Sequence, residues 1–151
     1  MTRENKPRAE LSHDQTTRKE WSADDLIFEN VVTDLGAIPF HDASGEVQRF
    51  APSRFPFPIH LAVHQIEVSG TAPRQYVEPH SHGYPELNIL IGGPGALVYR
   101  FELDGQVREV KSPATIWIPA GVKHAASAVS GSGHYVCMIL ANTKDVFPEL
   151  A

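Results

Sequence analysis

The sequence is poor in cysteine and has no long apolar run, and each absence excludes a class of protein. Cys137 is the only cysteine among 151 residues, so no intrachain disulfide can form. It lies in the apolar run HYVCMIL, where a small buried thiol is the ordinary interpretation. Every apolar stretch is far shorter than the roughly 20 residues that a membrane-spanning helix needs. The first residues also contain no apolar segment of the secretory type. We therefore expect a cytoplasmic protein without a membrane partner.

Positive charge is not in excess either. The chain carries 13 Lys and Arg against 18 Asp and Glu, a net charge of -5. Binding to nucleic acid depends on basic surfaces that neutralise phosphates, so nucleic acid is not expected as a partner. What the chain does have is 42% hydrophobic residues over 151 positions. That is enough for one domain with a core that supports itself.

Composition divides the chain into two parts. Residues 1–25 mix both signs of charge and contain few large apolar groups, which is typical of a flexible tail. Residues 26–151 form short runs rich in Val, Ile and Phe, separated by Pro and Gly every eight to twelve residues. This pattern predicts an all-β sandwich or barrel in a single domain.

Several segments of this domain can be assigned. LIFENVV, residues 26–32, is the first predicted strand, and the proline-rich APSRFPFP that follows later should run as an extended strap. IHLAVHQIEV, residues 59–68, alternates as a strand, which places His60 and His64 on one face, possible wall residues of a cavity. Residues 96–110 predict a hairpin whose two-residue turn is Asp104 and Gly105, because that dipeptide accepts the positive φ angles of a type I′ turn.

A cluster of metal-binding side chains occurs in HSHGYPELNILIGG, residues 80–93. His80 and His82 are two apart, so on a strand their rings lie side by side, and GYP then turns the chain so that Glu86 begins the next strand. Imidazole nitrogens and a carboxylate oxygen are suitable ligands for a divalent cation. Without an ion, burying these three groups would cost several kcal/mol. In IPAGVKHAA, residues 118–126, Pro119 and Gly121 predict a tight turn from which His124 can supply a fourth ligand.

Together the two stretches resemble the two motifs of the cupin superfamily. His80, His82, Glu86 and Gly93 match the first motif, and Pro119, Gly121 and His124 match the second. The resemblance spans roughly residues 58–141 and implies a small antiparallel jelly-roll barrel in which His80, His82, Glu86 and His124 hold one metal ion. The chain departs from the motifs at Arg74 and Pro113, where glycine is usual, and at Ala128, where asparagine is usual. These are turn or packing positions, so the departures concern loop geometry more than the ligands.

Strand alternation suggests further pocket residues. Counting from Glu86, Asn88 and Leu90 should face inward, and Tyr76 and Glu78 share the inward parity of His80 and His82. Asn88 is a candidate to hydrogen-bond a bound oxygen atom, or else a buried amide satisfied by the backbone. Glu78 is a candidate general base, or an exposed residue at the barrel rim. Tyr84 lies in the connecting turn and is the third candidate.

Four protein ligands on an octahedral ion leave two positions open, which favours an enzyme acting on a small organic substrate. Fe(II) is the favoured ion by resemblance to cupin oxygenases, and Zn, Mn, Ni, Co or Cu are compatible with the same ligands. A dioxygenase is the first hypothesis. A redox-neutral isomerase, lyase or rearrangement enzyme is the second, and a non-catalytic ligand-binding cupin is the third. A homodimer is expected, because a lone barrel would leave apolar strand edges exposed. The alternative is a monomer with the strap folded over its own sheet.

Overall fold

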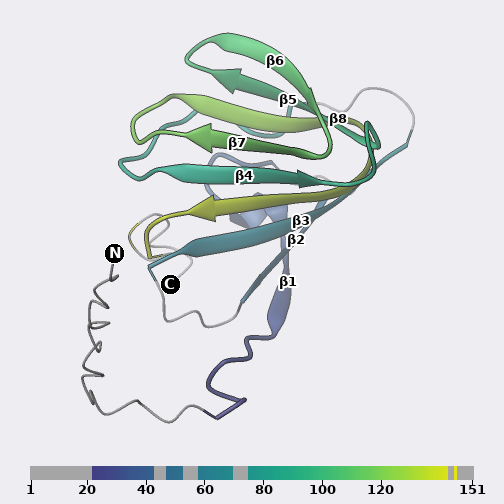
Figure 1. The fold of residues 1–151 in the computed structure, drawn as a ribbon. Coiled ribbons are helices and arrows are strands. Elements are labelled where there is room, and N and C mark those ends of the chain that lie inside the picture. The colour runs from purple at the N-terminus through teal and green to yellow at the C-terminus, as the bar shows by residue number, and fades with distance from the viewer. Residues whose placement is uncertain (1–21, 43–46, 53–57, 70–74, 143–144, 146–151) are drawn as a thin grey trace, which may run out of the picture.

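A computed structural model describes residues 22–42, 47–52, 58–69, 75–142 and 145. In these ranges the chain forms eight strands and one 3-10 turn (Figure 1). Their bounds are β1 Asn30–Asp34, η1 Leu35–Ala37, β2 Val47–Pro52, β3 His60–Val68, β4 Glu86–Ile91, β5 Leu97–Leu103, β6 Gln106–Lys111, β7 Ala114–Ile118 and β8 His124–Ile139. The all-β prediction is confirmed.

The strands pair into one antiparallel sheet whose order is β1-β2-β3-β8-β4-β7, with the β5–β6 hairpin attached to β8. β8 is the long strand that joins the two parts: its first half pairs with β5, and its second half lies between β3 and β4. Gly131, with φ +86°, stands where the partner changes. An added Cβ there would lie 1.9 Å from the Ala96 carbonyl oxygen, so only glycine allows this approach. In Figure 1 the strands curve around one interior.

Alternation along the strands separates the interior from the outer face. In β3 the buried positions include His60, Ala62 and His64, as the sequence predicts. In β5 the interior takes Leu97, Tyr99 and Phe101. The β5–β6 turn has φ +47° at Asp104 and +76° at Gly105, which confirms the type I′ prediction.

The first strand begins later than predicted. Residues 22–26 turn before it, with the Asp25 carboxylate accepting hydrogen bonds from the Ser22 backbone and hydroxyl, and β1 starts only at Asn30. A local Ser–Asp turn thus competes with the apolar run for these residues. Residues 1–21 of the expected tail and residues 53–57 of the expected strap lie outside the described residues.

The core lies between the curved parts of the sheet. Its largest fully buried side chains include Tyr99, Phe101, Ile66, Leu90 and Ile139. Tyr99 stacks on Tyr135 with ring centroids 4.8 Å apart. In the part of the chain that the structure describes, no helix combines the length and the apolar character needed to cross a membrane.

Candidate metal centre

A β-bridge brings the two histidine-bearing stretches together. The His80 backbone N–H donates to the His124 carbonyl at 3.0 Å, and the His124 N–H donates to the His80 carbonyl at 2.8 Å. The Gly121 N–H donates to the His82 carbonyl at 2.9 Å, and Gly121 adopts φ +83°. The tight turn predicted from Pro119 and Gly121 therefore lies against the His-x-His segment, although more than 35 residues separate His82 from Gly121 in the chain.

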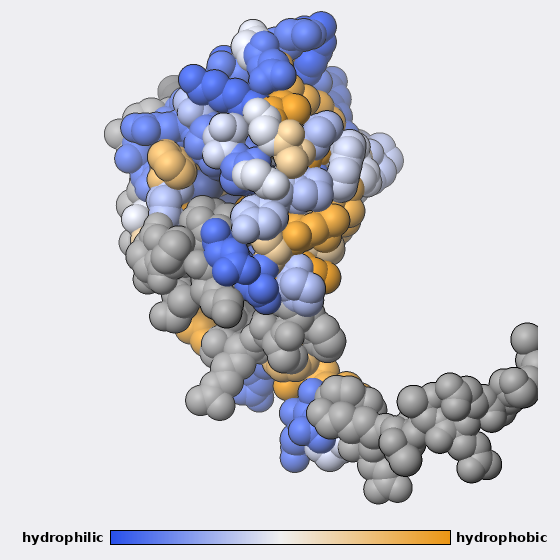
Figure 2. Space-filling model, turned by 90° about the vertical axis from the view of Figure 1, so that its left-hand side faces the viewer, coloured by the Kyte–Doolittle hydropathy of each residue, from blue (hydrophilic) through white to orange (hydrophobic). Residues whose placement is uncertain are grey.

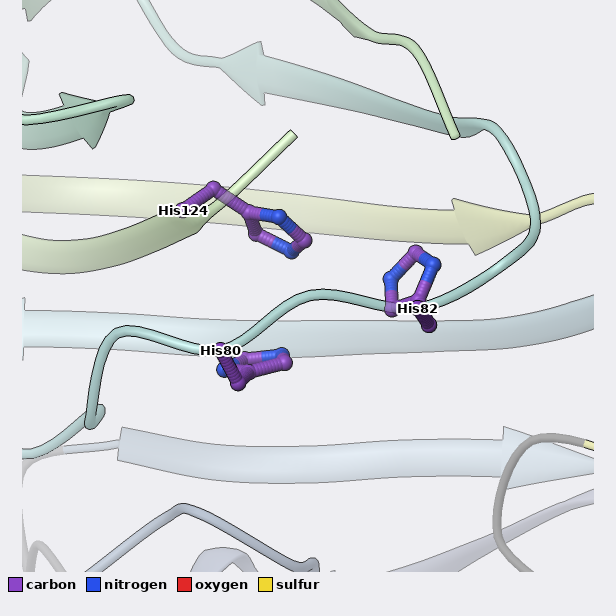
Figure 3. A group of neighbouring side chains, drawn as sticks. All are labelled: His80, His82 and His124. Carbon is purple, nitrogen blue, oxygen red and sulfur yellow. The ribbon is translucent and has the colours of Figure 1, made fainter. Parts of the chain in front are cut away.

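The three imidazoles converge at the end of the barrel interior (Figure 3). Their nearest ring nitrogens all lie within 4.8 Å of one another, so His80, His82 and His124 could hold a metal ion. Figure 3 shows that the rings come from two separate segments of the chain and face a common space. The side-by-side placement of His80 and His82, and the convergence with His124, were both predicted from the sequence.

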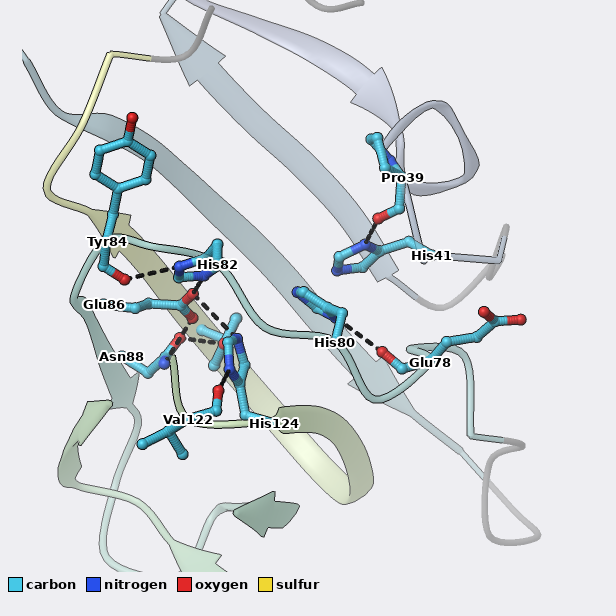
Figure 4. A network of polar contacts seen from close by, with 11 residues as sticks. Pro39, His41, Glu78, His80, His82, Tyr84, Glu86, Asn88, Val122 and His124 are labelled. Carbon is cyan, nitrogen blue, oxygen red and sulfur yellow. Dashed lines mark hydrogen bonds and ion pairs between the residues drawn. The ribbon is translucent and has the colours of Figure 1, made fainter. Parts of the chain in front are cut away.

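Each of these rings is fixed through its Nδ1 atom (Figure 4). His80 Nδ1 lies 2.8 Å from the Glu78 carbonyl, His82 Nδ1 2.7 Å from the Tyr84 carbonyl, and His124 Nδ1 2.9 Å from the Val122 carbonyl. A carbonyl can only accept, so each Nδ1 carries a proton. In the neutral ring the Nε2 lone pair is then free to bind a cation, which is how metal-binding histidines are commonly held.

Glu86 is placed beside two of these nitrogens. Its Oε2 atom lies 3.0 Å from His82 Nε2 and 3.4 Å from His124 Nε2. Adjacent ligands about 2.1 Å from one ion are separated by about 3.0 Å in octahedral and about 3.4 Å in tetrahedral geometry. The two distances from Glu86 Oε2 are therefore those of neighbouring ligands around one ion.

Burial makes this cluster unfavourable without a cation. His124 Nε2 is buried and has no hydrogen bond of good geometry among the described residues. Burial acts to lower the pKa of His124, but the Glu86 carboxylate outweighs it and raises that pKa. Burial likewise acts to raise the pKa of Glu86, yet the adjacent histidines and Asn88 hold it well below its usual value. An ionised carboxylate surrounded by imidazoles suits a bound cation, so the residues fit a metal ion.

Asn88 supports the carboxylate. Its side-chain N–H donates to Glu86 Oε1 at 2.8 Å, and its side-chain oxygen accepts a hydrogen bond from the Tyr135 hydroxyl. Asn88 is completely buried, as alternation predicts. Both ends of its amide are used, and its partners are side chains. In this structure it orients Glu86, so Asn88 is a positioning residue.

The other two candidates lie differently. Of the two readings of Glu78, the exposed residue is the one found: its side chain is exposed and points away from the histidines (Figure 4), so the inward parity counted from His80 does not hold. The cause is that residues 75–82 form only isolated bridges, Val77 with His41 and His80 with His124, so strand alternation does not hold there. Tyr84 is half-buried against the core, and its hydroxyl also points away from the cluster. Both contribute a carbonyl that fixes a histidine.

A pocket extends from the cluster into the barrel. His60 and His64 line it, as their shared face suggested, and Cys137 forms part of the same wall. Burial lowers the pKa of His60 to about 4 and that of His64 to about 3, so both are neutral at pH 7. Burial raises the pKa of the Cys137 thiol, in keeping with a wall residue and not a nucleophile.

Sequence reasoning missed His41. It lines the pocket close to His80, with ring centroids 6.1 Å apart, and its Nδ1 lies 2.7 Å from the Pro39 carbonyl. Its ring is thus fixed in the same manner as those of the cluster. The loop that carries it has no periodicity that could place it against the barrel. The only available signal was the residue type.

Comparison with solved structures finds many similar folds. An RmlC-like cupin from Shewanella frigidimarina is 13% identical with a TM-score of 0.50, covering 72% of this chain and 88% of that one. Fe(II) HppE is 13% identical with a TM-score of 0.50, covering 74% of this chain and 56% of that one. Pac13, a nucleoside dehydratase, is 7% identical with a TM-score of 0.50, covering 85% and 88%. Neither a protein-family model nor a curated protein matches the sequence.

These likenesses, at such low identity, concern the fold. The chain adopts the cupin fold, a jelly-roll of antiparallel strands, as the two sequence motifs implied. Three histidines that can hold a metal ion lie inside it.

Proposed function

We propose that the chain is a cytoplasmic, metal-dependent enzyme that acts on a small organic molecule at a mononuclear site. His80, His82, His124 and Glu86 are the proposed ligands. The observation that carries the proposal is the common arrangement of the three rings: each Nδ1 is fixed by a backbone carbonyl, which leaves each Nε2 directed at the shared space. Metal-binding histidines are commonly held in this way, with the ring nitrogen that does not bind the ion fixed by a backbone carbonyl.

The bound ion would supply Lewis acidity and, if it is iron, one-electron chemistry. The chain's own residues hold and shield the reactants. Glu86 brings one negative charge, kept in place by Asn88, so a divalent ion would retain a net positive charge toward a substrate. His60 and His64, neutral at pH 7, line the pocket beside the cluster. Ile38, Ala62 and Ile139 make parts of the wall apolar, which limits access of water.

Within this proposal a dioxygenase with Fe(II) is our first candidate. Fe(II) HppE shares the fold and was studied with ferrous iron, which supports an iron-based reaction without identifying the substrate. A redox-neutral reaction is the second candidate. It is supported by Pac13, a dehydratase on the same fold, and by ligands that suit Zn equally well.

Metal identity and oxygen uptake test the proposal. The full chain, purified under nitrogen, should contain about one metal ion per chain by elemental analysis. Iron together with O₂ consumption in the presence of catechols, thiols or 1,3-diketones would support the dioxygenase. Stoichiometric zinc, with no O₂ consumption, would favour the redox-neutral reaction. If the protein purified under nitrogen retains no metal, both candidate reactions are contradicted.

We further propose that the chain forms a homodimer through the outer face of its sheet. Val32, Phe50, Val63, Val136 and Ile89 follow one another in register across five strands on that face. Val32 at one edge is 61% exposed. Figure 2 shows apolar residues along one side of the molecule, while the upper end is hydrophilic. A second copy of this face would cover the apolar row.

The dimer predicts a specific effect of charge at its edge. Val32→Glu should convert a dimer into a monomer, because the partner would have to bury an unpaired carboxylate. Light scattering after size exclusion measures the mass directly. Val107→Glu, on the exposed β6 strand of the hairpin, is the matched control and should leave the dimer intact. A monomeric unsubstituted chain would contradict the proposal.

A further inference from the structure

A fourth imidazole faces the metal-binding cluster without belonging to it. His41 lines the same pocket as His80 and His124, and its ring centroid lies 6.1 Å from that of His80. The nearest ring nitrogens of His80, His82 and His124 all lie within 4.8 Å of one another, and His41 is not part of that group. The proposed ligand set is complete without His41, so this residue is available for contact with a bound molecule.

The ring of His41 presents a hydrogen-bond acceptor to the pocket. Its Nδ1 atom lies 2.7 Å from the Pro39 carbonyl, and because a carbonyl only accepts, Nδ1 carries the proton. In the neutral ring the Nε2 atom then has a free lone pair. Figure 4 shows this second nitrogen on the edge of the ring nearest His80. Within the described part of the chain Nε2 has no hydrogen-bond partner, and it is not among the polar atoms that are buried without one. It is therefore open to a molecule in the pocket.

The backbone around His41 is held in an unfavourable conformation. The preceding residue, Phe40, has φ +64°, which is rare for a bulky side chain and costs free energy. Hydrogen bonds on both sides keep the segment in place. The Glu78 N–H donates to the Phe40 carbonyl at 2.8 Å, and the Asp42 N–H donates at 2.7 Å to the carbonyl of Tyr76. Strained residues of this kind cluster at functional sites, where the surrounding structure fixes them. Here the strained segment holds His41 against the chain that leads into the His-x-His segment.

The other residues of the pocket narrow the chemistry of its ligand. Of the described residues that line the pocket, none is Lys or Arg, and Glu86 supplies a carboxylate. An anionic group of a ligand would therefore find a positive partner only at the metal ion. The Nε2 atom of His41, as an acceptor, needs an O–H or N–H donor. A hydroxyl whose oxygen binds the ion meets both conditions, because its oxygen faces the positive charge and its hydrogen remains free to be donated.

We propose that His41 accepts a hydrogen bond from a hydroxyl group of the substrate, and that the substrate is a small hydroxylated molecule whose hydroxyl oxygen binds the metal ion. The inference rests on the proposed metal-dependent function and gives a substrate-binding role to a residue outside the ligand set. A bound ion draws electron density from the hydroxyl oxygen, which makes that hydroxyl a stronger donor. The hydrogen bond to His41 therefore distinguishes a hydroxyl from an ether oxygen at the same position.

Glycolate and methoxyacetate test this hydrogen bond in the full-length protein loaded with about one Zn²⁺ per chain. Both can bind an ion through a carboxylate oxygen and a second oxygen, but only glycolate has a hydroxyl there. Isothermal titration calorimetry gives the preference of the unsubstituted protein for glycolate over methoxyacetate. In His41→Ala this preference should be about three- to tenfold smaller, which is the effect of one hydrogen bond. Comparing two ligands in two proteins cancels the differences between the ligands in size and in ion binding.

Three further variants identify the atom responsible. His41→Gln keeps an acceptor oxygen near the position of Nε2 and should retain most of the preference. His41→Leu, which is apolar and similar in size, should lose it as His41→Ala does. His134→Ala removes an exposed imidazole from β8 and should keep the full preference. Equal preferences in His41→Leu and in the unsubstituted protein would overturn the inference.

Metal content separates this inference from the proposed function. His41→Ala should retain about one Zn²⁺ per chain, because His41 lies outside the group of three histidines. Loss of zinc from this variant would make His41 a ligand and overturn the role given to it here. If the unsubstituted protein takes up no zinc, the proposed function fails together with the inference. If it takes up zinc and His41→Ala leaves the preference unchanged, the inference fails alone.

Discussion

His124→Ala is expected to abolish stable metal binding. Metal content after dialysis should fall from about one ion per chain to less than a tenth, since a lost ligand should weaken affinity by at least about one hundredfold. His124 is the residue through which the second stretch reaches the first, and its Nε2 atom is buried without a hydrogen bond among the described residues. Any activity that depends on the ion should fall in parallel. Circular dichroism should show the same strand content, because the β-bridge between residues 80 and 124 is formed by backbone atoms.

Two variants sharpen this experiment. His134→Ala removes an exposed imidazole from the same strand and should leave metal content unchanged. Glu86→Gln keeps the size of the side chain and removes its charge, so affinity should fall although the three histidines remain. Equal metal content in His124→Ala and in the unsubstituted protein would refute the ligand set proposed above.

Acid should destabilise the metal-free protein in a defined pH range. The pKa values of His60 and His64 are about 4 and 3 in the folded state, against 6.5 when exposed. Their folded pKa values are depressed, so below pH 6.5 the unfolded chain binds protons that the folded chain does not. The free energy of unfolding then falls by about 1.4 kcal/mol per pH unit for each residue, on the order of 6 kcal/mol for both by pH 4. The free energy of unfolding of a typical domain is about 5–15 kcal/mol, so this loss would be a large part of it.

Urea unfolding between pH 7 and pH 4, with a chelator present, measures this dependence. In His64→Leu the unfolded chain should take up about one proton fewer relative to the folded chain. The free energy of unfolding should then fall less steeply as the pH decreases, by about 1.4 kcal/mol per pH unit. His134→Leu, at an exposed position, is the matched control and should leave the slope as it is. A slope in His64→Leu equal to that of the unsubstituted protein would show that His64 is protonated in the folded state.

Much of the barrel and of the cluster was predictable because strands alternate with a period of two. That rule correctly placed His60, His64 and Asn88. It failed for Glu78, which lies in a segment held by isolated bridges and not by a continuous ladder. Side chains alternate between the two faces only where a strand is paired with neighbouring strands, and the sequence does not show where that pairing ends.

The residues that sequence reasoning missed share another cause. His41 lies in a loop, and Arg49 is a charged residue of the short strand β2 that is nevertheless only 6% exposed. Both acquire their position only from pairings made far away in the chain: His41 from its bridge with Val77, and Arg49 from its register with His64. Long-range register cannot be read from a window of ten residues.

The hydrogen-bonded chain from Tyr135 through Asn88 to Glu86 joins the aromatic core to the proposed ligand set. Tyr135 in turn stacks on Tyr99, whose hydroxyl lies 3.4 Å from that of Tyr76. Substitutions among these tyrosines would therefore change the position of the Glu86 carboxylate without replacing any of the proposed ligands.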